Sequence, residues 1–232
     1  MKALSLIRDV SGLLFEIFLP CEAEKSRDGR KSVFEIFKSF SEMMKPLKQR
    51  VEEELGTKLL AVMYTGKRHV NLRSDKKIDT PEDLNGIKLR MPGSTAWLFL
   101  GKTLGANPTP LAFSEVYTAL QTGAIDGQDN PLPIDKDSKF YEVTKQIVLT
   151  GHLVDFNYIA ISNRTWKKFS PEQQLVIQNA ADKAAEWNKS QQIEQENKLV
   201  EFFKEQGLSV YEPNIEAFRA KVQKEYSESE FS

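Results

Sequence analysis

Arg90 is the residue whose type and position most clearly suggest chemistry. It stands in residues 87–91, where Leu89 and Met91 alternate with basic side chains, and this pattern predicts a strand with Arg90 facing away from the two apolar residues. A Pro-Gly turn and a predicted helix follow, so Arg90 lies at the carboxyl end of the strand, where open α/β sheets bind ligands. A guanidinium there would grip a carboxylate with two parallel hydrogen bonds. A surface arginine in an ion pair is the more common role of such a residue and stays open.

Residues for catalysis or metal binding are few. The chain has two histidines, His69 and His152, and one cysteine, Cys21, with no His-Glu-x-x-His or Cys-x-x-Cys spacing. The segment Gly101-Lys102-Thr103 is similar to the end of a phosphate-binding loop, but Ala96 replaces the glycine that such a loop needs. We therefore expect no metal and no cofactor, and the sequence offers no clear pair of nucleophile and base.

The elements around Arg90 alternate between strands and helices. Residues 59–64 read as a buried strand broken at Thr65-Gly66, and Thr80 caps a short helix with Asp83 closing a capping box. The other expected elements are a loop at 22–32, helices at 33–55, 94–104, 115–122 (capped by Ser114) and 215–226, and strands near Ile125 and at 146–149, 156–161 and 208–211. This order predicts an α/β fold.

A second strong helix start lies at Ser170-Pro171-Glu172-Gln173. No glycine or proline follows Pro171 before Gly207, which predicts a helix of about 36 residues and about 54 Å at 1.5 Å per residue. So long a helix is unusual in a small domain. It suits an element that crosses between two lobes.

Composition excludes some classes of function. The chain of 232 residues has 32 basic and 33 acidic residues and a net charge of −1, so it lacks the basic footprint of a nucleic-acid-binding protein. No apolar run reaches the roughly 18 residues that a membrane span needs. Charged residues interrupt the apolar stretch near the N-terminus, so we read no convincing export signal in the chain.

Three longer segments carry a family resemblance. They are 64–68 (YTGKR), 81–92 (PEDLNGIKLRMP) and 105–133 (GANPTPLAFSEVYTALQTGAIDGQDNPLP), and the match runs over roughly residues 34–226. In this order they resemble the solute-binding proteins of tripartite ATP-independent (TRAP) transporters, the DctP family. The likeness is strongest to binders of sialic acid and other sugar acids.

The resemblance implies a ligand-binding role for six residues. They are Arg90 as the clamp on the ligand carboxylate, Arg68 as a second arginine near that group, Asn130 as a further carboxylate contact, Phe113 as an aromatic wall, His152 in the surrounding polar network, and Asn157 near a polar pocket position. Each has a purely structural alternative. Phe113 fits a core residue, Asn130 a turn cap, His152 a structural histidine and Arg68 a surface charge.

The resemblance also implies a fold and a function. The fold is the two-lobed α/β architecture of periplasmic binding proteins, type II-like, with a long helix spanning both lobes. The function is capture of a small organic carboxylate, such as a sialate, a uronate or a C4-dicarboxylate, in the periplasm. The partners would be the small and large membrane permease subunits, with uptake driven by an ion gradient, and the protein would not be an enzyme.

The resemblance does not extend to residues 1–32, so we expect an incomplete first lobe. Residues 1–65 and about 153–195 would form the remnant of that lobe with the hinge helix. Residues 66–152 and about 196–232 would form the second lobe, which carries the carboxylate clamp. Two alternatives stay open at this point: a truncated fragment without function, and an α/β enzyme acting on a carboxylate.

Overall fold

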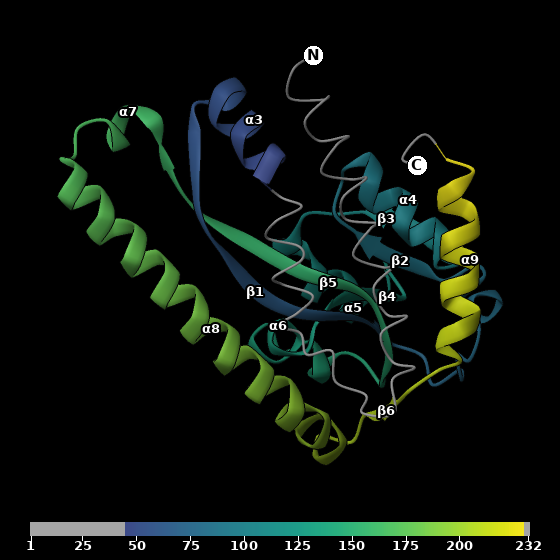
Figure 1. The fold of residues 1–232 in the computed structure, drawn as a ribbon. Helices are drawn as coiled ribbons and strands as arrows, with labels where there is room; N and C mark the ends of the chain where they lie inside the picture. The colour runs from purple at the N-terminus through teal and green to yellow at the C-terminus, as the bar shows by residue number, and fades with distance from the viewer. Residues whose placement is uncertain (1–44, 230–232) are drawn as a thin grey trace, which may run out of the picture. The chain divides into compact units, whose positions relative to one another are not determined.

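The structure, a computed structural model, describes residues 45–229 (Figure 1). The α/β class predicted from the sequence is confirmed. The helices and strands are α3 (Lys45–Leu55), β1 (Thr57–Leu72), β2 (Lys88–Met91), α4 (Thr95–Thr103), β3 (Asn107–Pro110), α5 (Val116–Thr122), β4 (Gly127–Pro131), α6 (Leu132–Asp137), β5 (Gln146–Ser162), α7 (Asn163–Trp166), α8 (Pro171–Glu205), β6 (Ser209–Tyr211) and α9 (Ile215–Ser227). Short 3₁₀ turns η2 (Pro81–Leu84), η3 (Phe113–Glu115) and η4 (Phe140–Glu142) join them. The expected loop at 22–32 and most of the helix expected at 33–55 lie outside the described residues.

The described residues form two compact units. Unit 1 comprises 45–65 and Phe156–Gln191, and unit 2 comprises Gly66–Asp155 and 192–229. The division falls within β1, β5 and α8, so each of these three elements contributes to both units.

The mixed sheet has the strand order β3-β2-β4-β1-β5-β6. Within unit 2, β2 runs parallel to β3 and to β4, while β1 runs antiparallel to β4. Strand β6 pairs in parallel with β5. Because β2, β3 and β4 share one direction, their carboxyl ends meet at the same edge of the sheet.

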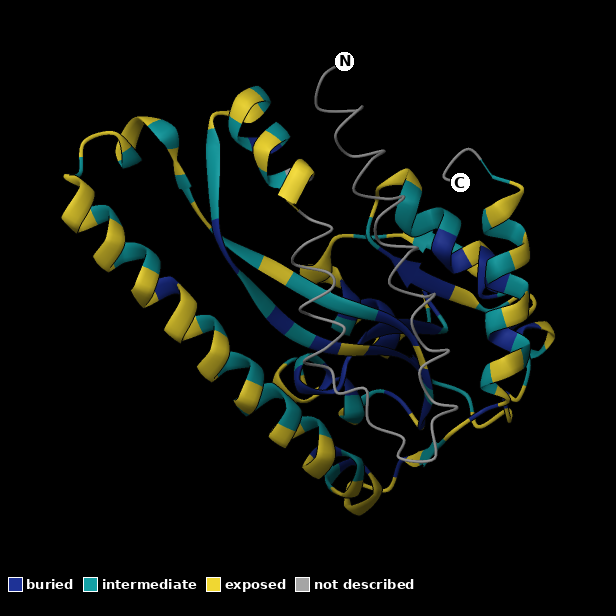
Figure 2. Cartoon of the chain, viewed as in Figure 1, coloured by how far each residue is buried: buried dark blue, intermediate teal, exposed yellow. Residues whose placement is uncertain are grey.

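Two apolar clusters anchor unit 2, and its strand β4 is buried along its whole length (Figure 2). One gathers α5 around Phe140, which is 1% exposed. The other packs Ile147 of β5 against Leu199 and Phe203 of α8. On β2 and β3 lies α4, which also contacts α9. These clusters fix the strands whose ends carry the polar residues described below.

Unit 1 is smaller, and its core joins β1, β5 and α8. Leu60 and Ala61 of β1 pack with Ala181 of α8, with Ile159 and Trp166 alongside. Side-chain amides of α8 also bond backbone carbonyls of β1, as when Asn188 Nδ2 donates to Tyr64 O over 2.6 Å.

The long helix expected after Ser170 is confirmed as α8, which has 35 residues. The helix start predicted at Ser170 forms, and it is a capping box, since Gln173 N donates to Ser170 Oγ and Ser170 N donates to Gln173 Oε1. The capping box predicted at Thr80 also forms, although the helix that it begins is the 3₁₀ turn η2. Leu175 and Trp187 of α8 are exposed.

Three expectations about local structure were wrong. Gly66 does not end a strand: β1 continues through it with φ +126°, where an added Cβ would lie 2.8 Å from Pro131 Cβ and 2.9 Å from Glu196 Oε1. Ser114 does not cap α5, which begins after the 3₁₀ turn η3 with no side-chain cap. The two short strands expected between 146 and 161 are one strand, β5, of 17 residues.

Gly105 tests how closely unit 2 is packed. It has φ +95°, and an added Cβ would lie 2.0 Å from Pro81 O. We expect Gly105→Ala to lower the free energy of unfolding by more than about 3 kcal/mol, because both the backbone conformation and the clash cost energy. Gly86→Ala is the matched control, since Gly86 has φ +80° and nothing within 4 Å of the added Cβ.

Chemical denaturation of the two variants separates the two costs. Gly86→Ala should lose only about 1–2 kcal/mol, the cost of a left-handed alanine. Equal losses in the two variants would show that the contact with Pro81 contributes nothing.

Candidate functional site

The polar residues of unit 2 gather where β2, β3 and β4 end. Arg90 of β2 pairs with Gln128 of β4, and Met91 pairs with Pro110, the last residue of β3. Asn130 lies two residues beyond Gln128, and Phe113 follows β3 after a short connection. The register therefore places Arg90, Asn130 and Phe113 at one edge of the sheet, the edge at which open α/β sheets bind ligands.

Among the described residues, the Nε atom of Arg90 is hydrogen-bonded, whereas its two terminal nitrogens are not. Its Nε donates to the backbone oxygen of Leu111 over 2.8 Å, and its guanidinium carbon lies 5.8 Å from the centroid of the Phe113 ring. Within residues 45–229, its two terminal nitrogens have no hydrogen-bond partner. Burial lowers the pKa of Arg90, the Asp129 carboxylate opposes this, and the Arg68 charge lowers it further. An incoming anion would relieve both effects.

Arg68 has the opposite character, because its guanidinium is already paired. Nε donates to Asp129 Oδ2 over 2.8 Å, Nη1 donates to Asp155 Oδ2 over 2.6 Å, and Nη2 donates to the backbone oxygen of Asp129 over 2.5 Å. The guanidinium carbon also lies 4.5 Å from the centroid of the Trp97 ring. Burial acts to lower the pKa of Arg68, but the two carboxylates outweigh it and raise the pKa.

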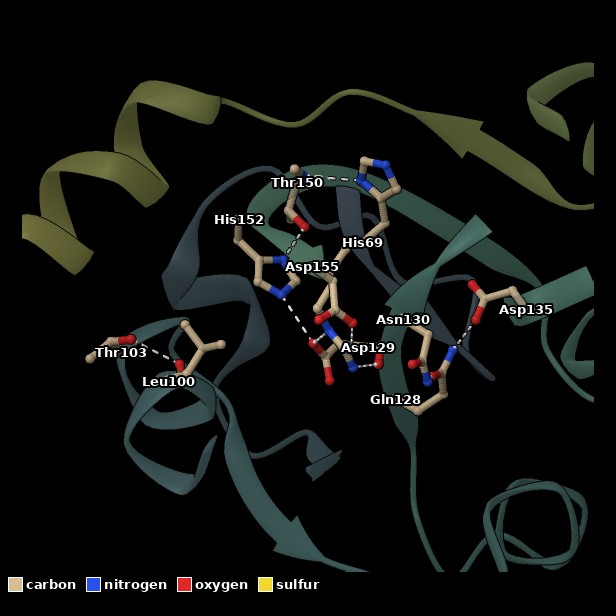
Figure 3. A network of polar contacts seen from close by, with 12 residues as sticks. His69, Leu100, Thr103, Gln128, Asp129, Asn130, Asp135, Thr150, His152 and Asp155 are labelled. Carbon is tan, nitrogen blue, oxygen red and sulfur yellow. Dashed lines mark hydrogen bonds and ion pairs between the residues drawn. The ribbon is translucent and has the colours of Figure 1, made fainter. Parts of the chain in front are cut away.

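Asp129 is the carboxylate to which Arg68 and His152 both bind, and Figure 3 shows its contact with His152. It is fully buried, and its Oδ2 accepts from Arg68 and lies 3.2 Å from His152 Nε2. Burial acts to raise the pKa of Asp129, but Arg68 and His152 outweigh it and hold the pKa below its ordinary value. Asp129 therefore stays ionised and balances the charge of Arg68.

His152 joins Asp129 to Thr150 in a line of three side chains (Figure 3). Thr150 Oγ1 lies 2.7 Å from His152 Nδ1, so the order hydroxyl, imidazole, carboxylate is that of a catalytic triad. Thr150 is only 3% exposed, however, and Asp129 is engaged by Arg68. A nucleophile must reach its substrate, so this line fits a structural network better than a catalytic one.

A second chain of polar contacts lies behind Asn130 (Figure 3). Asn130 Nδ2 donates to Gln128 Oε1 over 2.5 Å, and Gln128 Nε2 donates to Asp135 Oδ1 over 2.8 Å and to Asn71 Oδ1 over 3.2 Å. Burial raises the pKa of Asp135 well above its usual range.

The six predicted residues fall into groups. Arg68 and His152 share Asp129, and Arg90 contacts Phe113 and lies within electrostatic range of Arg68 and Asp129. Phe113 is 48% exposed and so lines an open surface next to Arg90. Asn130 adjoins Asp129 in the chain and bonds Gln128. Asn157 is exposed on the part of β5 that belongs to unit 1.

Sequence reasoning missed the residues that bind Arg68. Asp129, Asp155 and Trp97 all contact its guanidinium, and none was singled out beforehand. The signal for Asp129 was present in the Asp-Asn-Pro segment, where only the asparagine was selected. Asp155 lies 87 positions from Arg68, and no local pattern reveals a partner at that distance.

Metal and membrane features do not appear in residues 45–229. No group of three or more His, Cys, Asp or Glu side chains there is arranged to hold a metal ion. No helix in the same range is both long and apolar enough to cross a membrane.

The sequence matches the model of one protein family. Residues 30–231 match the model of the bacterial extracellular solute-binding proteins, family 7 (DctP). The sialic acid-binding periplasmic protein SiaP of Vibrio cholerae is 38% identical over 212 residues, which cover 91% of this chain and 64% of SiaP. This chain therefore spans about two thirds of the length of that relative.

Solved structures give the same fold. A TRAP periplasmic solute-binding protein of Roseobacter denitrificans with bound 3-deoxy-D-manno-oct-2-ulosonic acid is 59% identical, with a TM-score of 0.80 over 82% of this chain and 63% of that one. A second protein from Roseobacter denitrificans, with bound L-galactonate, is 30% identical, with a TM-score of 0.73 over 88% of this chain and 66% of that one.

The buried His69 predicts how the stability of unit 2 changes with pH. Its Nδ1 accepts from Gly151 N over 3.0 Å, and burial, with smaller effects of His152 and Lys67, lowers its pKa from 6.5 to about 3. Between pH 6.5 and 3 the His69 imidazole binds a proton in the unfolded chain but not in the folded chain. The free energy of unfolding therefore falls as the pH falls through this window. We expect His69 to cost the wild type about 1 kcal/mol of unfolding free energy between pH 6.5 and 5.5.

The variant His69→Asn isolates this effect, because Asn retains an acceptor for Gly151 N and does not titrate. Urea melts at pH 6.5 and 5.5 should show a smaller loss of stability in the variant than in the wild type. Identical losses in both proteins would show that His69 titrates normally.

Proposed function

We propose that this chain, which belongs to the bacterial extracellular solute-binding proteins of family 7, captures a small organic carboxylate for a TRAP transporter. The observation that carries the proposal is the contrast between its two buried arginines. Arg68 is neutralised by Asp129 and Asp155, whereas the terminal nitrogens of Arg90 have no partner within residues 45–229. A buried guanidinium with an open fork calls for an anionic ligand that can accept two parallel hydrogen bonds.

The surroundings of Arg90 favour a planar carboxylate. Leu111 O fixes Nε, so the remaining edge of the guanidinium has one orientation. The exposed face of Phe113 lies beside it and offers an apolar wall to the carbon skeleton of a ligand. In this proposal Arg90 clamps the carboxylate and Asn130 donates to it, while Arg68 supports the site by neutralising Asp129.

The remaining predicted residues take supporting roles in the proposal. His152 holds Asp129 in place for Arg68, and Phe113 is the aromatic wall. Unit 2 would be the lobe that carries the clamp.

The names of the relatives support a sugar acid as the ligand. The protein with 59% identity holds 3-deoxy-D-manno-oct-2-ulosonic acid, another holds L-galactonate, and one from Sulfitobacter, 27% identical, holds β-D-galacturonate. These ligands share a carboxylate on a polyhydroxylated chain or ring. We propose a sugar acid of this kind, with the eight-carbon 2-oxo acid as the first candidate because of the higher identity.

The rest of the transport function follows from the same proposal. The protein would work in the periplasm and deliver its ligand to the membrane permease subunits, with the ion gradient as the driving force. It would bind its ligand unchanged and not act as an enzyme, in keeping with the burial of Thr150 in the one triad-like line of unit 2.

A melting scan against a panel of acids tests the proposed function. A true ligand at 100 times its dissociation constant adds about 2.7 kcal/mol to the free energy of unfolding. We expect 3-deoxy-D-manno-oct-2-ulosonic acid, L-galactonate or D-galacturonate to raise the melting temperature of the purified chain, and the matching neutral sugars to leave it unchanged. A cooperative melt that none of the acids shifts would contradict the proposal.

Arg90→Lys tests the carboxylate clamp. An ammonium keeps the charge but has no planar fork, so we expect affinity for the acid identified in the scan to fall by about 10- to 100-fold. Titration calorimetry measures the change.

Arg73→Lys provides the matched control for this substitution. Arg73 lies just after β1 in the same unit, and within residues 45–229 its side chain makes no hydrogen bond or ion pair with Arg90 or Asp129, so the variant should bind with wild-type affinity. Wild-type affinity in Arg90→Lys would exclude Arg90 as the clamp.

A further inference from the structure

All the hydrogen-bonding atoms of the Gln128 side-chain amide have partners. Both hydrogens of Nε2 are used, one toward Asp135 Oδ1 at 2.8 Å and one toward Asn71 Oδ1 at 3.2 Å. Its Oε1 accepts from Asn130 Nδ2. The side chain is fully buried, so water does not compete for these contacts.

The hydrogen bonds of Asn71 fix the direction of this network. Asn71 Nδ2 donates to Thr144 Oγ1 over 2.9 Å and to the backbone oxygen of Gln146 over 3.0 Å, and a backbone oxygen can only accept. Asn71 must therefore present its oxygen to Gln128. The amide nitrogen of Gln128 therefore has to face Asn71, and the same nitrogen also donates to Asp135 Oδ1.

Turning the Gln128 amide over would convert two attractive contacts into repulsive ones. Its oxygen would then face the oxygen of Asn71, and its amino group would face the amino group of Asn130. Each lost contact costs the desolvation of a buried polar group. Gln128 therefore has one orientation, and it obliges Asn130 to turn its nitrogen toward Gln128.

We propose that Gln128 is a positioning residue for ligand binding, which fixes the order of oxygen and nitrogen in the Asn130 amide. This inference rests on the proposed function. With Nδ2 bonded to Gln128, Asn130 keeps one N–H and its oxygen for a ligand. The N–H suits a carboxylate oxygen, and the Asn130 oxygen suits a neighbouring hydroxyl. Ligands with a hydroxyl next to the carboxylate, or a ring hydroxyl in its place, would gain from this fixed order.

Asp135 makes the arrangement sensitive to substitution at a distance. It lies on α6 and reaches Asn130 only through Gln128. Its Oδ1 accepts one hydrogen bond from Gln128 Nε2, so a substitution that removes this acceptor would loosen the Gln128 amide.

The experiment is a double-mutant cycle on affinity, measured by titration calorimetry with 3-deoxy-D-manno-oct-2-ulosonic acid, L-galactonate and D-galacturonate as probes. Gln128→Met keeps the length of the side chain and removes its amide. We expect it to weaken the probe that binds by about tenfold in the wild-type background, and to have no effect in the Asn130→Ala background. Asp135→Leu should weaken binding roughly threefold in the same pattern, and Asp135→Asn, which keeps an acceptor oxygen, should restore most of that loss.

A merely structural role would give a different pattern. General destabilisation would lower affinity equally with and without Asn130, and that result would overturn the inference. Thr103→Val is the matched control: Thr103 is fully buried and bonds only Leu100 O, so its loss tests a buried polar contact unconnected to Asn130. We expect the control to retain wild-type affinity.

The outcomes separate the inference from the proposed function. If the wild type binds a probe and folded Gln128→Met binds it equally well, the positioning role is wrong and the proposed function stands. If the wild type binds none of the three, both fail. If Gln128→Met gives no cooperative melt, the Asp135→Leu and Asp135→Asn pair decides by the same cycle, and equal affinities in those two variants overturn the inference.

Discussion

The buried ion pair between Arg68 and Asp129 is the constraint on which the arrangement of unit 2 depends. Removing a charge from water costs several kcal/mol, and only a close, well-oriented partner offsets the cost. The pair joins β1 to β4, which run antiparallel, and Asp155 and His152 add hydrogen bonds to it. With Arg68 neutralised in this way, Arg90 is the buried arginine of unit 2 whose terminal nitrogens have no partner within residues 45–229, and the proposed ligand carboxylate would supply one.

This division between two arginines explains why the site needs both. A single arginine with an open fork beside Asp129 would be drawn to that carboxylate and lost to the ligand. Arg68 satisfies Asp129 from β1 and so offsets the repulsion that this carboxylate would exert on an anion near Arg90. Arg90 is kept apart by its bond to Leu111 O, the residue that follows β3. The affinity for an anion thus depends on strand register as much as on residue identity.

The sequence predicts those parts of the fold that local chemistry decides. The capping boxes at Thr80 and Ser170 and the long helix α8 depend on neighbours within a few positions, and all three are present. Gly66 was taken for a strand end because glycine usually weakens strands, whereas here the close approach of Pro131 and Glu196 requires it within β1. Strand β3 was missed because it contains two prolines, which an edge strand tolerates.

Local sequence patterns likewise predict only part of the candidate site. Arg90 and Asn130 could be proposed because each ends a strand, and parallel strands bring their carboxyl ends together. Asp129, Asp155 and Gln128 act through partners 61, 87 and 57 positions away, so their roles depend on a register that no local pattern encodes. Once the register is known, the donors and acceptors leave one consistent direction of bonding, from Asn130 through Gln128 to the backbone oxygen behind Asn71. The order of oxygen and nitrogen in the Asn130 amide therefore depends on a buried chain of amides, and neither composition nor spacing reveals that chain.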